Sequence, residues 1–481
     1  MSIFSFFRII FIVLATIGTA FLLPIITALC CHEEQVIQAF LIPMVASWIL
    51  GVFFFLKGRK IQIKFSTRAV FIFVSSVWIF ISLFGALPLW LSGAIPNFTD
   101  AFFESTSGFS TTGATILSEI ESLPRSINLW RCEMHWLGGM GIIALTVALL
   151  PLLGVGSFQL IKAESTGPEK GKITPKMANT AEVLWFLYFG FTVAETIILQ
   201  LCGMDFIDAL SHSFSTLGTG GFSTRNSSIA SYNSVLIEIV CTIFMFLSGI
   251  NFSLYFYLIL RKFGEIKKNS EFKAYLLIFG VVTVMLTLTL ISHYGSLSKA
   301  FRYSTFQVAS IMTTTGFATT DYLTWPNISQ FFIFILFFIG GCSGSTSGGF
   351  KVIRWVILWK QSRNEMLRML HPYGVFTLRV NGQPGRKDLV LNVGSFIFVY
   401  FVVVFVTTLM GTAANLDIFT SLTTSLTMIG SIGPAFGSLG PSENYGALLP
   451  WLKWWYCFVM IAGRLELYNM IIILTKDFWQ R

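Results

Sequence analysis

Long apolar runs alternate with short polar connections along almost the whole chain. About ten of these runs reach the roughly 20 residues that a helix needs to cross the hydrocarbon core of a bilayer. They lie near residues 3–29, 37–56, 69–93, 128–153, 181–203, 233–260, 273–293, 328–361, 389–412 and 450–475. The runs do not alternate apolar and polar residues, as the strands of a membrane β-barrel do. The pattern therefore predicts an all-α membrane protein with about ten transmembrane helices.

A second pattern interrupts the first. Four short stretches rich in threonine, serine and glycine recur at intervals of about 100 residues, which indicates an internal repeat. They read STTGAT, GTGGFST, TTTGFAT and GSIGPAFG, and their central glycines are Gly113, Gly221, Gly316 and Gly433. An apolar segment too short to span the membrane precedes each stretch, at 98–109, 206–217, 299–311 and 416–428. We interpret each segment as a half-helix that enters the membrane and turns back.

This repeat divides the chain into five parts. A two-helix hairpin at 1–60 is followed by four units of helix, half-helix, loop and helix, at 61–165, 166–265, 266–370 and 371–481. A bilayer tolerates irregular backbone only where protein surrounds it or water reaches it. Four equivalent loops satisfy that condition most simply when they meet around one axis. We therefore expect a pseudo-fourfold pore.

The residue types in the four loops suit a monovalent cation. Carbonyl oxygens from extended backbone can replace the water shell of such an ion, and glycine permits positive φ and close approach to the axis. Threonine and serine hydroxyls add oxygen atoms, and the half-helices direct partially negative C-terminal ends at the cavity below. The predicted filter comprises Thr111, Thr112, Gly113, Thr219, Gly220, Gly221, Thr314, Thr315, Gly316, Ser431, Ile432 and Gly433.

Simpler explanations exist for single parts of this pattern. One loop taken alone is equally well explained as a polar outer turn, because threonine and glycine are ordinary turn formers. Four loops in register favour the pore. The acidic residues near the loops are better explained as helix N-caps or solvated charges than as ion ligands; they are Asp100, Glu104, Asp205, Asp208, Asp321 and Asp417.

Charge placement fixes the orientation of the chain. The formal net charge is +9, yet only 11% of the residues are charged and 54% are hydrophobic, a composition typical of the bilayer. Lysine and arginine gather at 57–68, 162–176, 261–273 and 351–387. The positive-inside rule makes these segments cytoplasmic. Because orientation accounts for the basic charge, no nucleic-acid partner is expected.

The eighth apolar run contains a polar interruption, GGCSGSTSGGF at 340–350. Each glycine costs about 1 kcal/mol relative to alanine in a helix, so this composition disfavours a continuous helix. We interpret it as a polar loop that lines the aqueous path, and a close helix crossing through small residues is the alternative. The candidate residues are Gly340, Gly341, Ser343, Gly344, Ser345, Thr346, Ser347, Gly348 and Gly349.

Charged residues inside the apolar runs invite functional interpretations. Arg464 lies near the middle of the last run, where a charge costs at least about 2.5–3.5 kcal/mol. It either pairs with a buried acid such as Glu466 or Glu195, or projects into the conduction path and opposes cations. Glu133 and His135 are interpreted as a hydrogen-bonded structural pair rather than a proton relay.

The four units with single central glycines, the motif IGPAFG in the fourth loop and GGCSGSTSGGFK in the third unit together resemble the Trk/Ktr/HKT superfamily of potassium transporters, and its bacterial Trk members most of all. The resemblance implies that residues 340–350 and Arg464 form a gate below the filter. Gly113, where some plant members have serine and prefer sodium, implies that the ion bound at the filter is potassium. The fourth loop departs from the other three, because Pro434 follows its glycine.

The resemblance also implies an inner-membrane location in bacteria, a homodimer, and a cytosolic nucleotide-binding regulatory subunit of the Trk type. We therefore expect gated potassium uptake, channel-like or as a symporter, with no organic cofactor in this chain. A sodium-selective or poorly selective permease of the same fold is one alternative. A membrane scaffold without transport is another. An enzyme is not expected, because no nucleophile, acid–base pair or metal cluster lies at a common depth.

Overall fold

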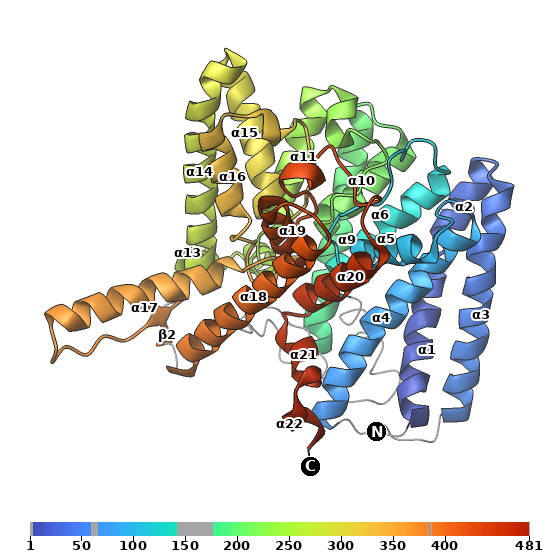
Figure 1. Cartoon of the computed structure of the whole chain (residues 1–481), viewed down its shortest axis with the longest axis horizontal. Helices are drawn as coiled ribbons and strands as arrows, with labels where there is room; N and C mark the ends of the chain where they lie inside the picture. Colours follow the sequence, from blue (N-terminus) through green and yellow to red (C-terminus); the bar gives the residue numbers. More distant parts are fainter. Residues whose placement is uncertain (1–2, 59–65, 142–176, 382, 385–386, 481) are drawn as a thin grey trace.

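The computed structural model describes residues 3–58, 66–141, 177–381, 383–384 and 387–480 (Figure 1). The fold class is all-α, as predicted. Among the described residues the strands are limited to β1 (Arg379–Val380) and β2 (Gln383–Pro384), a short antiparallel pair. The expected unit boundaries at 60/61 and 165/166 and the basic segment 162–176 lie outside the described residues. The division into four units therefore stays a prediction.

Three helices form the N-terminal part of the bundle, namely α1 (Ile3–Ala20), α2 (Leu22–Cys30) and α3 (Glu34–Gly58). The pair α1 and α3 lies at one side of the molecule, next to α4 (Figure 1). Buried Ile10, Val13 and Ile17 follow helical spacing on α1, so one face of this helix packs inward. Arg8 is also buried, and its Nη1 donates to the carbonyl oxygen of Gly58 at 2.7 Å.

Each of the four units begins with a long helix and continues with a half-helix. The long helices are α4 (Thr67–Leu91), α9 (Met177–Leu201), α14 (Ser270–Tyr294) and α18 (Lys387–Ala413). The half-helices are α5 (Phe98–Phe109), α10 (Phe206–Gly218), α15 (Leu297–Met312) and α19 (Ile418–Gly430). Their ends agree with the predicted segments to within about two residues, the usual uncertainty of a helix boundary. Three of them begin at side-chain caps, from Asn97, Asp205 and Asp417.

The second helix of each unit is too short to cross a bilayer by itself, which takes about 20 residues. These helices are α6 (Arg125–Gly139), α11 (Val235–Ser248), α16 (Asn327–Leu336) and α20 (Pro450–Arg464). The chain bends by 92° between α11 and α12 (Phe252–Ile259), and by 117° between α20 and the segment Tyr468–Leu474. Six described helices are long and apolar enough to span, or up to eight when each bent pair counts as one. The apolar runs predicted at 233–260 and 450–475 thus each contain a bend that the sequence analysis did not predict.

Close backbone packing accounts for the position of two of these breaks. A Cβ atom on Gly138 in α6 would overlap the carbonyl oxygen of Phe109 at the end of half-helix α5. A Cβ atom on Gly463 in α20 would overlap the carbonyl oxygen of Ile429 near the end of α19. Glycine lets the second helix press directly on the end of the half-helix. After α20 the chain turns by 117°.

The units follow one another around a common centre. The second helix of one unit packs against the half-helix of the next, α6 on α10, α11 on α15 and α20 on α5. In the remaining pair, Phe334 of α16 and Phe419 of α19 bring their ring centroids to 5.8 Å. The half-helices therefore surround one central region. This cyclic order is what brings the four loops together.

The remaining elements are short or lie at the edge of the bundle. Helix α17 (Val352–Leu370) projects away from the bundle beside α18 (Figure 1). The others are α13 (Phe263–Lys268), α21 (Tyr468–Ile471), α22 (Lys476–Trp479) and the 3-10 turns η2 (Ser228–Tyr232), η3 (Tyr322–Thr324), η4 (Gly437–Leu439) and η5 (Ile472–Leu474).

The packing of α6 on α5 can be tested with two alanine substitutions. We expect Gly138→Ala to lower the thermal unfolding midpoint of the detergent-purified protein, because its Cβ has no room beside Phe109. Gly190→Ala on α9 is the matched control, since open space surrounds that position. Alanine there should be neutral or stabilise the helix by up to about 1 kcal/mol. Equal midpoints for the two variants would contradict the proposed close contact.

Candidate functional site

The four loops share one unusual backbone conformation. Two residues before each central glycine the chain adopts positive φ, at Thr111 (56°), Thr219 (52°), Thr314 (57°) and Ser431 (54°). The glycines follow with φ of 77° at Gly113, 83° at Gly221, 87° at Gly316 and 92° at Gly433. The left-handed region costs a residue with a Cβ roughly 1–2 kcal/mol, and threonine is rarely found there. Strain of this kind, repeated four times, is typical of a functional site.

The same hydrogen bond closes the turn in each loop. The residue just before the central glycine donates its backbone N–H to the carbonyl oxygen five residues earlier in the half-helix. The pairs are Thr112 to Ser107 (2.9 Å), Gly220 to Ser215 (2.9 Å), Thr315 to Ser310 (2.8 Å) and Ile432 to Thr427 (3.0 Å). This is the bond that ends a helix in a Schellman motif. The fourfold repetition therefore lies in the main chain, whatever the side chains are.

The loops contact one another in a closed ring. A Cβ atom built on a central glycine would meet the carbonyl oxygen of the next loop at less than 3.0 Å, a separation that real Cβ atoms essentially never show. The contacts run from Gly113 to Gly220, from Gly221 to Thr315, from Gly316 to Ile432 and from Gly433 to Thr112. Both the positive φ and the lack of space exclude a side chain at these four glycines. The structure thus brings together all twelve residues of the predicted filter, from all four units.

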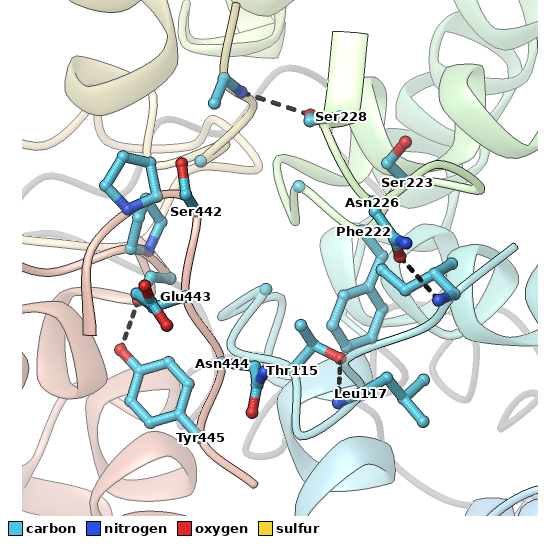
Figure 2. Close-up of a pocket in the computed structure, with 18 of the residues that line it drawn as sticks. Thr115, Leu117, Phe222, Ser223, Asn226, Ser228, Ser442, Glu443, Asn444 and Tyr445 are labelled. Carbon is cyan, nitrogen blue, oxygen red and sulfur yellow. Dashed lines mark hydrogen bonds between the residues drawn. The ribbon is translucent and has the colours of Figure 1, made fainter. Parts of the chain in front are cut away.

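A cavity lies against one side of this ring. Its volume is about 120 Å³, and its lining includes the four central glycines together with residues that follow them, such as Thr115 and Ser223 (Figure 2). We call it the outer vestibule. At its wall the Tyr445 hydroxyl donates to the carbonyl oxygen of Gly433 at 2.8 Å. The described residues form no cluster of three His, Cys, Asp or Glu side chains that could hold a metal ion. At the ring itself the oxygen atoms belong to carbonyl and hydroxyl groups, whereas the vestibule wall also carries the carboxylate of Glu443 and the amides of Asn226 and Asn444.

The loop at 340–350 lies directly beside the ring. The Gly348 N–H donates to the Thr314 hydroxyl at 2.7 Å, and a Cβ on Gly348 would meet the carbonyl oxygen of Gly430 at 2.5 Å. The loop is also tied to the break after α11, because the Cys342 N–H donates to Gly249 O at 2.9 Å. The sequence predicted a polar loop that lines the aqueous path, and it gave no indication of the bonds that hold this loop. The structure shows that it is fastened by hydrogen bonds at several points.

Arg464 joins this loop to the ring. Its Nη1 donates to the carbonyl oxygen of Thr346 at 2.9 Å and to the Thr111 hydroxyl at 3.1 Å. Its Nη2 donates to the carbonyl oxygens of Gly138 and Gly139 at 2.6 and 2.8 Å. Glu466, one of the acids considered as its partner, forms an ion pair with Arg354 at 2.8 Å. Arg464 therefore bridges the first loop, the 340–350 loop and the end of α6.

A second cation near the ring was not predicted from the sequence. Lys351 is buried and donates from Nζ to the carbonyl oxygen of Ser347. It lines a cavity of about 20 Å³ together with Gly348, Gly349 and Arg464. The only signal in the sequence was its position directly after the glycine-rich loop. Three cations, Lys351, Arg354 and Arg464, and one carboxylate, Glu466, thus line this cavity.

A buried ion pair lies behind the first loop. Arg131 of α6 and Glu104 of α5 are both fully buried, and Nη2 lies 2.7 Å from Oε1. Glu104 also accepts from the Thr115 hydroxyl and from the Ile116 N–H, each at 2.9 Å. The guanidinium of Arg131 stacks on the ring of Phe222, 4.3 Å from its centroid. The sequence analysis treated Glu104 as one acid among six and did not identify Arg131.

His135 forms hydrogen bonds with half-helix α5 and with the second loop, and it does not pair with Glu133. Its Nδ1 lies 2.8 Å from the carbonyl oxygen of Gly108, and its Nε2 accepts from the Phe222 N–H at 3.2 Å. Both ring nitrogens are therefore used, so the predicted Glu133–His135 pair was wrong. Residues two apart on a helix do not face each other, which is the physical reason. The imidazole also occupies the space where Gly220 would carry a Cβ.

The other acidic residues have structural partners. Asp205 and Asp417 cap α10 and α19, as predicted. Hydrogen bonds from Thr420 lower the pKa of Asp417, so this carboxyl stays ionised at the start of its half-helix. Asp100 pairs with Lys453 at 2.6 Å, and Asp208 pairs with Arg225 at 3.1 Å. Asp321 caps η3.

Comparisons with known proteins match this architecture along the chain. A family model described as "TrkH: Cation transport protein" matches residues 36–480. The Trk system potassium uptake protein TrkH of Halomonas elongata is 36% identical over 100% of both chains. The Trk system potassium uptake protein TrkG of Escherichia coli K12 is 37% identical and covers 95% of this chain and 94% of its own. The crystal structure of the potassium transporter TrkH from Vibrio parahaemolyticus superposes with a TM-score of 0.87, at 33% identity over 100% of both chains.

The buried pair makes a prediction about stability. We expect Glu104→Gln to destabilise the purified protein by about 3–5 kcal/mol, because Arg131 would keep its charge without a carboxylate. The effect is measured as a fall in the thermal unfolding midpoint. Glu121→Gln is the control, since Glu121 is exposed and makes only long contacts, an ion pair with Arg225 at 4.0 Å and a hydrogen bond from the Asn226 N–H at 3.4 Å. The double variant Glu104→Leu/Arg131→Met should recover much of the loss, and a midpoint as low as that of Glu104→Gln would contradict the charge argument.

Proposed function

This chain belongs to the TrkH family of cation transport proteins, and from that premise we propose that it carries potassium through the ring of four loops. It is a multi-pass protein of the bacterial inner membrane. The observation that supports transport most strongly is the closed ring itself, in which every central glycine meets a carbonyl oxygen of the next loop. The relatives quoted above are named potassium uptake proteins, which supports potassium as the ion.

In this proposal the filter is built mainly from main-chain oxygens. The carbonyl groups of Thr112, Gly220, Thr315 and Ile432 belong to equivalent positions and lie at the contacts between loops. Carbonyl oxygens in such a ring can replace the hydration shell of a monovalent cation. Gly220 and Ile432 offer no hydroxyl where Thr112 and Thr315 do, so the second and fourth loops contribute fewer side-chain oxygens. Fewer ordered ion positions are therefore expected than in a ring of four identical loops.

The gate in this proposal consists of the 340–350 loop and Arg464, with Lys351 as an addition that the sequence did not suggest. Arg464 and Lys351 place positive charge on the inner side of the ring. An ion that leaves the filter inward must pass this charge, which opposes cations. The hydrogen bonds from Gly348 to Thr314 and from Arg464 to Thr111 connect the gate to the filter. Opening would require that these bonds break or move.

Uptake would run inward along the membrane potential, which supplies about 2.3 kcal/mol per charge per 100 mV. We also propose a homodimer and a cytosolic nucleotide-binding subunit. The relatives are named as parts of a Trk system, which supports further subunits. The basic residues at 261–273 and 351–387 would face such a subunit in the cytoplasm.

Potassium uptake is tested by rescue of a potassium-uptake-deficient bacterium at limiting potassium. We expect the intact protein, expressed with its regulatory subunit, to restore growth and Gly113→Ser to fail, because a Cβ would overlap Gly220 O. Gly93→Ser is a matched control. Gly93 has a similar φ of 74°, and no atom lies within 4 Å of the place that its Cβ would take, so this variant carries the backbone strain without the clash.

Two outcomes of this experiment would contradict the proposal. Equal rescue by the intact protein and by Gly113→Ser would remove Gly113 from the filter. Lack of potassium flux through purified protein in liposomes, with or without the subunit, would favour a scaffold. A potassium-to-sodium permeability ratio near one in the same liposomes would favour the poorly selective permease.

The proposed gate makes a separate prediction. We expect Arg464→Ala to raise the potassium flux of the purified protein in liposomes by up to about tenfold, which corresponds to about 1.4 kcal/mol of barrier. The reason is the loss of a positive charge and of its bond to Thr346. Lys268→Ala, which removes an exposed cation of α13, should leave the flux unchanged. Unchanged or lower flux in a well-folded Arg464→Ala protein would reject this role.

A further inference from the structure

The four half-helices carry different polar residues at one equivalent buried position. Nine residues before the central glycine stand Glu104, His212, Gln307 and Thr424 in the first to fourth units. All four are fully buried. Because the four half-helices and their loops have the same backbone conformation, these side chains occupy equivalent places behind their own loops. What each of them bonds to, however, differs between the units.

In the first two units the residue holds the exit segment, by which we mean the residues that follow the central glycine. Glu104 accepts from the hydroxyl of Thr115, two residues after Gly113, at 2.9 Å. His212 Nε2 lies 2.9 Å from the hydroxyl of Ser223, two residues after Gly221. The two side chains differ in type, yet each engages a hydroxyl at the same position. Both Thr115 and Ser223 line the outer vestibule.

In the third and fourth units this connection is missing among the described residues. Ala318 and Ala435 stand two residues after the glycine, so no hydroxyl is available. Both amide atoms of Gln307 and the hydroxyl of Thr424 are buried without a hydrogen-bond partner. Unsatisfied buried polar groups are uncommon in folded proteins. At this one equivalent position, the third and fourth units therefore differ from the first two.

One hydrogen-bonded network spans the first two loops. Arg131 donates to Glu104 at 2.7 Å and, from Nη1, to the carbonyl oxygen of Ser223 at 3.4 Å. His212 is itself fixed, because its Nδ1 donates to the carbonyl oxygen of Asp208 at 2.7 Å. A chain of bonds therefore runs from Thr115 through Glu104 and Arg131 to Ser223 and His212. Buried networks in which each member is satisfied hold geometry more rigidly than single bonds.

We propose that Glu104 and His212 are positioning residues for ion selectivity, which act by fastening the exit segments of the first and second loops through the hydroxyls of Thr115 and Ser223. This inference rests on the proposed function. In the cavity-size account of selectivity, carbonyl oxygens must move inward to bind a smaller cation such as sodium as closely as potassium. The bonds of Thr115 and Ser223 resist that movement in the first two loops. The exit segments of the other two loops lack this bond and are held by different ones, such as the bond from the Ser310 hydroxyl to the Phe317 carbonyl oxygen.

The test removes the hydroxyls and leaves the buried charges in place. The potassium-to-sodium permeability ratio is measured from reversal potentials of purified protein in liposomes. We expect Thr115→Val and Ser223→Ala each to lower the ratio by about tenfold, equivalent to about 1.4 kcal/mol, while potassium still permeates. Thr115→Ser and Ser223→Thr keep the hydroxyl and should restore the ratio. A purely structural role would not produce this rescue together with retained flux.

The matched control is Gln307→Leu, at the same position of the third half-helix. Leucine replaces an amide without partners, so the ratio should stay that of the intact protein and stability should not fall. An unchanged ratio in both hydroxyl variants, or an equal fall in Gln307→Leu, would overturn the inference. If Thr115→Val does not assemble, Thr115→Cys replaces it and the same outcomes apply. An intact protein without potassium preference would instead contradict the proposed function.

Discussion

Four glycines of this protein lie where no Cβ atom can fit, and the site depends on that constraint. Each one faces a carbonyl oxygen of the neighbouring loop, so the loops can close into a ring only if all four positions lack a side chain. The left-handed residue two positions before each glycine makes the turn possible, at a conformational cost that the surrounding packing offsets. The long helices and the cyclic packing of second helices on half-helices bring these four strained turns to one place.

Much of this arrangement could be predicted because its signals are local. The half-helices are short apolar segments that end in a threonine- and glycine-rich stretch, and α5 lies at the predicted residues 98–109. The breaks in the second helices were missed, because single glycines such as Gly249 and Gly463 are common in uninterrupted membrane helices. Only the packing of Gly463 on Ile429 O shows why the chain turns there. Composition alone identified the one break that carries a long polar sequence, at 340–350.

The interactions behind the ring could not be predicted for another reason. Arg131 and Glu104 are 27 residues apart and come from different helices, so neither charge reveals its partner in the sequence. His135 bonds to the first unit at Gly108 and to the second at Phe222, which requires knowledge of how the two units pack. Lys351 likewise becomes relevant only once the preceding loop is placed beneath the ring. Long-range contacts of this kind depend on the tertiary structure, and no periodic pattern in the sequence indicates them.

The broken second helices have a mechanical consequence. A continuous helix would transmit any tilt of one end directly to the other. The bends of 92° and 117° instead separate α11 and α20, as one layer, from the segments that follow them, as a second layer. Near the ring the layers are coupled by a few hydrogen bonds, among them those of Gly348 and Arg464. A displacement of the layer after the bends would then not pass directly through the helix to the ring of four loops.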